Sequence, residues 1–499
     1  MRKVIDNQIK IGEVDISGIE FDLRSRDEIP KLLMGLQAVY CNKEIREKIF
    51  ILLEEAIPED ISKTTGRPGM ELWKILVLGT LRLNCNWDYD KLKEIADNHS
   101  RLREMLGHVK WLDITEYPLQ TLKDNVKLFT PELLDKINKV VVDYGHSLLK
   151  KKAEKLEGRC DSFVVENNVH YPTDTNLLYD AVRKSVELIT TVYNDFNLNN
   201  WRQSKSLLQK LKNTLRKFQK MRHSNSKDEK KKQKRADEIK DICKSFMAKS
   251  RHLLDRVLSD MASLRSDGIG TDSDLEHVFV MITKFTEYAD LLLDQIQRRI
   301  INGETIPHEE KIFSIFEEYT EWIVKGKAGI SQELGLNVCI IEDQFGFILN
   351  HRVMRGEVDK SIAVPFTSDT KKTFPILISC SYDKGFWTPE NEPALNEILE
   401  EVCLPKKGKL SHKDKERESN EKFGKARKKH SAVESGINAL ENHGLDRCPD
   451  HGIEAFDRYI SYAVLARNFQ ILGNIIQKKE MARRKRSERM KRVKRKLAA

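Results

Sequence analysis

Three acidic residues, far apart in the chain, have the surroundings that a carboxylate needs in order to act on a bound ion. Asp161 lies inside a short β-rich run at 159–165. Asp383 follows the apolar run 374–380, so it stands at the carboxyl end of an expected strand. Glu434 lies in an expected helix, beside the apolar face of that helix. Elements of this kind can bring three distant carboxylates to one place.

Carboxylates gathered in this way suit the cleavage of phosphodiester bonds with divalent metal ions. Mg²⁺ is a hard cation that prefers oxygen ligands. Two such ions about 4 Å apart can activate an attacking oxygen and stabilise a leaving one. Their ligands must stand on rigid elements. We therefore expect Asp161, Asp383 and Glu434 to be metal ligands wherever the fold brings them together.

Each of these acids also has an ordinary structural explanation. Asp161 can cap or turn the chain at the start of a strand, and Asp383 can be a turn residue before Gly385. Ser431 and Glu434 have the spacing of a capping box, in which Glu434 folds back on the start of its helix. The residues alone leave these alternatives open.

The strands expected around the acids are interrupted by a long helical block. Two apolar, β-leaning runs at 336–341 and 345–353 are separated by a short polar break, which predicts a hairpin. Helices are expected near 393–402, 431–443 and 453–476. Without the helical block the order is strand, hairpin, short helix, strand, helix, helix. That order suits a mixed α/β fold of the ribonuclease-H-like type, with a mixed sheet.

The sequence predicts four parts in the chain. They are an all-α N-terminal DNA-binding domain at 1–150, a split ribonuclease-H-like catalytic domain at 151–174 and 330–476, a helical insertion at 175–329, and a basic tail at 477–499. The tail is dense in Lys and Arg and is expected to be disordered.

Arg67, Arg101 and Arg103 lie near the ends of short helices in the N-terminal part. Several short helices with arginines at their ends suit a DNA reader of the helix-turn-helix type. A plain helical bundle with solvated arginines explains them equally well, because no base-reading residue can be identified from one sequence.

The composition favours a charged globular protein with a polyanionic partner. Lys and Arg number 87 against 77 Asp and Glu, so the net charge is +10. A basic excess favours nucleic acids through charge neutralisation, although many proteins of similar charge bind none. The most apolar stretch, 72–83, is interrupted by two basic residues and is too short to span a bilayer. The eight cysteines contain no CxxC pair, which indicates a cytoplasmic protein with reduced thiols.

Four stretches resemble the DDE transposases of bacterial insertion sequences, especially the ISNCY-like group. They are 66–69 with the helix after it, 160–166 with 170–174, 383–387 with 389–391, and 431–440 with 444–447. They stand in the order of that family and span most of the chain. In the family the last three stretches carry two catalytic aspartates and a catalytic glutamate, which map to Asp161, Asp383 and Glu434.

The resemblance implies a transposase of a mobile element that binds the ends of its insertion sequence, cleaves DNA strands and joins them to target DNA. It implies two Mg²⁺ or Mn²⁺ ions, with Asp161 and Asp383 sharing the metals and Glu434 holding the second ion. A homodimer on double-stranded DNA is implied, because two element ends must be paired. The place of action would be the nucleoid of a prokaryotic cytoplasm.

Five basic residues lie near the acids in sequence and can contact phosphates or form a solvated face. They are Lys384, Arg427, Lys428, Lys429 and Arg447.

Other interpretations of the same sequence remain. Glu166, Asp174 and Asp180 lie close enough to Asp161 to be the first acid instead. The chain can also be a non-catalytic DNA-binding protein that keeps the transposase fold. A third alternative is a helical scaffold that binds nucleic acid by charge alone, which salt would weaken steeply.

Overall fold

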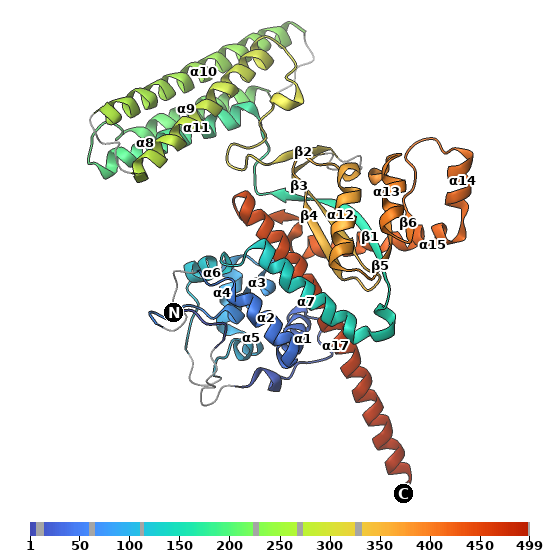
Figure 1. Cartoon of the computed structure of the whole chain (residues 1–499). Helices are drawn as coiled ribbons and strands as arrows, with labels where there is room; N and C mark the ends of the chain where they lie inside the picture. The colour runs from blue at the N-terminus through green and yellow to red at the C-terminus, as the bar shows by residue number, and fades with distance from the viewer. Residues whose placement is uncertain are drawn as a thin grey trace. The chain divides into compact units, whose positions relative to one another are not determined.

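The computed structural model describes residues 1–5, 14–58, 65–109, 114–222, 229–266, 273–324 and 332–497 as a mostly helical, mixed α/β protein (Figure 1). The chain divides into two compact units. One unit consists of Met1–Asn168 and Ile323–Ala499, and the other of Val169–Trp322. The first unit thus holds both the segment expected as an N-terminal domain and the segments expected as a split catalytic domain.

A mixed sheet of seven strands organises the first unit. Its order is β2-β3-β1-β5-β6, with β4 paired to β3 and β7 paired to β1. The strands are β1 (Leu156–Asn167), β2 (Glu321–Val324), β3 (Gln332–Glu342), β4 (Ile348–Val353), β5 (Leu377–Tyr382), β6 (Glu401–Cys403) and β7 (Arg447–Cys448). The expected mixed α/β class with a mixed sheet is therefore confirmed at this level.

The strand directions follow from the pairing of β1 with its two neighbours. β1 runs antiparallel to β3, with Asp161 opposite Ile340. It runs parallel to β5, with Cys160 opposite Tyr382. β3 and β4 are antiparallel neighbours, which confirms the expected hairpin. β5 and β6 are again parallel.

In the first unit, helices pack on the sheet, and N-terminal helices pack against the C-terminal helix. α7, α12, α16 and α17 pack against its strands, and α17 also packs against α1 and α3. The helices are α1 (Glu28–Cys41), α2 (Lys43–Glu54), α3 (Leu72–Asn84), α4 (Tyr89–Asn98), α5 (Ser100–Met105), α6 (Leu119–Val126), α7 (Pro131–Leu149), α12 (Asp359–Thr373), α13 (Asn391–Ile398), α14 (His412–Ser419), α15 (Glu421–His430), α16 (Ala432–Leu440) and α17 (Ile453–Leu497).

Glycines allow α1 and α17 to cross at close range. A Cβ atom on Gly35 would meet the backbone carbonyl of Phe469, and one on Gly473 would meet that of Lys31. The backbones approach each other here because neither helix carries a side chain at the crossing. This crossing explains why the segment 1–150 and the C-terminal helix belong to one unit.

Residues 477–497, which the sequence analysis assigns to a basic tail, continue α17 as a helix. Lys, Arg, Glu and Met have high helix propensity, and the buried first half of α17 supplies the costly first turns. In the part of the chain that the structure describes, no helix has the length and apolar character needed to cross a membrane.

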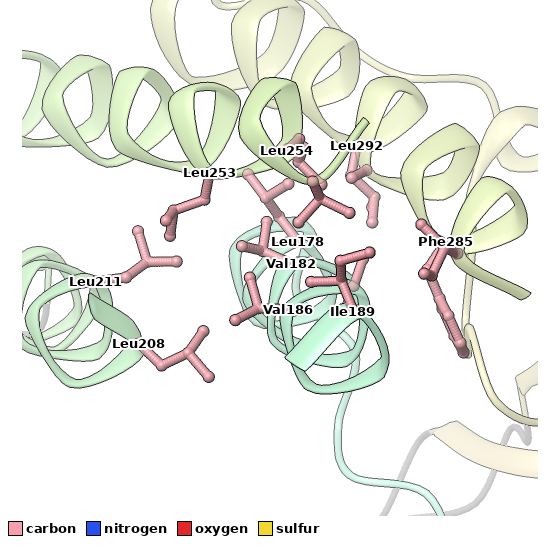
Figure 2. Packing of buried hydrophobic residues seen from close by; sticks show 14 of the residues in the cluster. Leu178, Val182, Val186, Ile189, Leu208, Leu211, Leu253, Leu254, Phe285 and Leu292 are labelled. Carbon is pink, nitrogen blue, oxygen red and sulfur yellow. The ribbon is translucent and has the colours of Figure 1, made fainter. Parts of the chain in front are cut away.

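The second unit is a set of long helices with a hydrophobic core of its own. Figure 2 shows leucine, valine and isoleucine side chains from different helices, together with Phe285, pointing into this core. The helices are α8 (Asp174–Asp195), α9 (Ser204–Arg222), α10 (Glu229–Ser266) and α11 (Ser273–Ile296).

Candidate active site

The sheet register brings the first two candidate acids to the same level. β1 and β5 are parallel neighbours, and their last paired residues are Cys160 and Tyr382. The next position on each side is Asp161 and Asp383. Asp161 is in the middle of the 12-residue strand β1, so the alternative that it caps a strand start is wrong. Asp383 precedes a 3-10 turn but makes no side-chain capping hydrogen bond to it.

The electrostatics of Asp161 show that other carboxylates lie nearby. Burial is the largest influence and raises the pKa of Asp161 to about 6, from an ordinary value of 3.8. The backbone N–H of Ser162 donates to Oδ1 at 2.8 Å and opposes that rise. The negative charges of Asp383, Asp359 and Glu434 add to it. Like charges make ionisation of a carboxylate less favourable, so Asp383, Asp359 and Glu434 lie within electrostatic range of Asp161, and we call these four groups the carboxylate cluster.

Glu434 stands on α16, whose buried face packs against β1. Gly436 on that face lies against the carboxylate of Glu342, where a Cβ atom would collide with it. Glu434 itself is exposed beside the packed face. The capping-box explanation is wrong, because Ser431 has helical backbone angles and its hydroxyl donates to the carbonyl of Lys428 at 3.0 Å instead.

Asp359 is a member of the cluster that sequence reasoning missed. It is the first residue of α12, and its Oδ1 accepts a hydrogen bond from the Ser162 hydroxyl at 2.7 Å. Its Oδ2 lies where a Cβ atom on Gly385 would point, so the turn after β5 closes over it. Burial and the charge of Asp383 raise the pKa of Asp359. Asp359 belongs to none of the sequence motifs. The available signal was its position at the start of the helix that follows the hairpin.

His430 is a second neighbour that the sequence did not single out. Its Nδ1 lies 3.0 Å from the hydroxyl of Ser381, the residue before the end of β5. Burial lowers the pKa of His430, and the charges of Asp383 and Glu434 act in the opposite direction. Its position four residues before Glu434 on a helical segment was an available signal.

The donor types suit Mg²⁺ or Mn²⁺, since four carboxylates supply hard oxygen ligands. Within the described residues, no group of three or more His, Cys, Asp or Glu side chains is close enough to hold one ion. Metal binding at this cluster would therefore require these side chains to draw together.

The alternatives for the first acid are engaged elsewhere. Glu166 forms an ion pair with Arg447 at 2.6 Å. Asp174 and Asp180 belong to the second unit, where they pair with Arg299 at 3.1 Å and with Arg183 at 3.3 Å. The largest charge effects on Asp161 come from Asp383, Asp359 and Glu434 instead.

The two arginines expected to read DNA from α5 make intramolecular contacts. Arg101 pairs with the buried Glu104 at 2.9 Å. Arg103 donates to the backbone carbonyls of Asp97 and Thr115, so it ties neighbouring segments together. These contacts favour the bundle explanation for both residues.

The basic residues predicted to bind DNA differ in whether they form ion pairs within the protein. Arg427 and Lys429 pair with acids, at 3.6 Å and 2.8 Å, as Arg447 does. Arg67, Lys384 and Lys428 are exposed, and no ion pair of theirs is found among the described residues. Lys384 directly follows Asp383 in the chain, and the cation whose charge acts on Asp359 is Lys407.

A cavity of about 560 Å³ lies between β1, β5, β6 and α15, and none of the four carboxylates is among its lining residues. It is open to solvent, and its lining includes Arg159 and Ser381, which stand two residues before Asp161 and Asp383. Its wall includes the basic side chains Arg417, Lys422, Lys425 and Lys429.

No protein-family model matches the chain, no curated protein matches it in sequence, and no solved structure matches its fold.

Proposed function

We propose that this protein is a metal-dependent DNA transposase of the DDE type, with Asp161, Asp383 and Glu434 as its catalytic acids. The observation that carries the proposal is the cluster on β1, β5 and α16. Adjacent parallel strands bring two acids to one level, and the charge of Glu434 reaches Asp161. These observations support a site shared by three motifs of the resemblance.

The strand order supports a ribonuclease-H-like catalytic fold. An antiparallel hairpin, β3 and β4, stands on one side of β1, and two parallel strands, β5 and β6, stand on the other. The second unit enters the chain between β1 and β3, as a helical insertion would.

In this proposal the protein's own residues bind and orient the reacting groups. Asp161 and Asp383 would hold the metal ions, Asp359 would hold Ser162 and add negative charge, and Glu434 would complete the site from α16. When bound, two divalent ions activate the attacking oxygen and stabilise the leaving one. Lys384 can bind a phosphate next to Asp383.

The test is strand cleavage by the full chain on duplex DNA that carries the sequences flanking its reading frame. We expect cleavage with Mg²⁺ and none with a chelator. Asp383→Asn and Glu434→Gln should each abolish it and leave folding and DNA binding intact. Glu397→Gln, a change of the same kind at an exposed residue of α13 outside the four motifs, is the matched control and should cleave normally.

Cleavage by Asp383→Asn at the wild-type rate would show that the assigned site is wrong. Binding of the flanking DNA without any cleavage by the wild-type protein would favour the alternative of a non-catalytic DNA-binding protein. A dimer on DNA is part of the proposal, since two ends must be joined. It would appear as a complex of two chains and two duplexes in light scattering.

A further inference from the structure

Helix α9 in the second unit carries an unusual excess of positive charge. Its 19 residues include seven Lys or Arg and no Asp or Glu. The neutral apolar side of the helix is used for folding, because Leu208, Leu211, Leu215 and Phe218 are buried in the core of the unit. Figure 2 shows the first two of these pointing toward α8 and α10. The charged side must therefore face outward.

Four of the cations share one exposed face. At about 100° per residue, Lys210, Arg216, Lys217 and Lys220 fall within an arc of about 120° opposite the buried side, and all four are exposed. The other positions on this arc are polar, and two of them, Gln209 and Asn213, bond to each other at 2.9 Å. We call these four cations the α9 basic face.

Within the described part of the chain, no ion pair neutralises the α9 basic face. No ion pair within 4.0 Å involves its cations among the residues that the structure describes. Elsewhere in the same unit such pairs are common: Arg251 pairs with Asp290 at 2.6 Å and Arg265 with Glu276 at 3.0 Å. Uncompensated cations held on a rigid helix repel one another unless an anionic partner is bound.

Charge is distributed unevenly over the unit. α8 has four acidic and two basic residues, and α11 has five acidic and one basic residue. α10 is basic in its first half and runs beside α9, where the exposed Lys249 donates to Thr214 at 2.9 Å. An anionic partner is therefore attracted to the side of α9 and α10 and repelled by α8 and α11.

The chemistry of the face favours a phosphate backbone over other anionic partners. A membrane-surface helix must insert apolar side chains, and those of α9 are buried in the core. A protein interface would need aromatic or aliphatic anchors, and the exposed arc has none. Lys, Arg, Asn and Gln side chains are common donors to phosphates. A helix of 19 residues is about 28 Å long, and duplex DNA carries many phosphates over that distance.

We propose that the α9 basic face binds the phosphate backbone of double-stranded DNA, without reading its sequence. The choice of duplex DNA as the polyanion rests on the proposed function, while the face itself does not. The face would hold DNA independently of the carboxylate cluster, so binding and cleavage can be separated by experiment.

The test is fluorescence anisotropy of the full chain with a labelled duplex of arbitrary sequence, in a chelator, over a range of NaCl concentrations. The variant is Lys210→Gln, Arg216→Gln, Lys217→Gln and Lys220→Gln combined, which keeps helix propensity. Each phosphate contact contributes about 0.9 to the slope of log affinity against log salt. We expect the slope to become shallower by about 3 to 4, and affinity at moderate salt to fall at least about tenfold.

The matched control also removes four positive charges from the second unit. It removes them at cations that already form ion pairs with acidic residues. It combines Arg183→Gln, Arg251→Gln, Arg265→Gln and Lys284→Gln, all in exposed or half-buried ion pairs. Exposed pairs contribute little to stability, so the control should fold, as circular dichroism would verify for both proteins. Its salt slope should change by less than about 1.

Equal losses in the two variants would overturn the proposal, because net charge alone would then explain binding. An unchanged slope in the α9 variant would also overturn it. Stronger α9-dependent binding to single-stranded RNA or to anionic vesicles than to duplex DNA would show that the partner is wrong. The binding assay contains a chelator, so its result does not depend on cleavage. If the separate cleavage assay with Mg²⁺ fails, the proposed function is refuted and the binding result still stands.

Discussion

Replacing Asp161 with Asn should make the folded protein more stable at neutral pH. Folding raises the pKa of Asp161 from 3.8 to about 6, because the side chain is buried and lies near other carboxylates. At neutral pH the wild-type protein therefore holds an unfavourable negative charge. Asn keeps a carbonyl oxygen that can accept from Ser162 and removes the charge.

The size of the effect follows from the two pKa values. The difference between 3.8 and about 6, at about 1.4 kcal/mol for each pH unit, gives about 3 kcal/mol as the largest expected gain. Because folding raises the pKa, the folded state binds the proton more tightly than the unfolded chain. The contribution of Asp161 to stability is thus complete below 3.8 and is lost as the pH rises to about 6.

The assay is urea unfolding of both proteins between about pH 4.5 and 8. The difference in the free energy of unfolding should be smallest at the acid end, about a third of its full size, grow through the window that ends near pH 6, and then stay constant. Asp446→Asn, at an exposed position of the same unit, is the control and should show no such growth. Mg²⁺ should stabilise the wild-type protein more than the variant, because only the former offers the carboxylate.

Two results would refute this reasoning. One is a variant less stable than the wild type at neutral pH, which would mean that the Asp161 charge is compensated. The other is a gain of equal size at every pH, which would assign the effect to packing or hydrogen bonding instead of ionisation.

Three further changes test other parts of the structure. Asp359→Asn should lower Mg²⁺-dependent cleavage by about 10- to 100-fold if its carboxylate supports the metal site, and cleavage at the wild-type rate would remove it from the site. Arg82→Met should lower the free energy of unfolding in urea by about 3 kcal/mol. The buried guanidinium pairs with Asp450 at 2.7 Å, and its loss leaves that carboxylate unpaired. A decrease of less than about 1 kcal/mol would contradict this. Gly473→Ala should cost about 1 to 3 kcal/mol by forcing α1 and α17 apart, whereas Gly424→Ala, with open space around it, should not destabilise the protein.

Local patterns were sufficient to predict the elements that carry the candidate site. Alternation and apolar runs predicted β1, the β3–β4 hairpin and β5, because these strands are built from β-leaning residues bounded by polar breaks. Helical spacing predicted α16 and the start of α17. The choice of Asp161, Asp383 and Glu434 rested on motif resemblance and stays a prediction as to function.

Only the tertiary structure decided which side chains meet. The level of Asp161 with Asp383 depends on strand register, and the approach of Asp359 depends on the packing of α12 over the turn after β5. Such contacts join residues that are distant in the chain, so no local pattern encodes them. Arg101 and Arg103 make their intramolecular contacts for the same reason, since their partners are positioned by folding. The positive charge of α9 follows directly from its sequence. The exposure of its cations opposite a buried face was determined by the packing of the second unit.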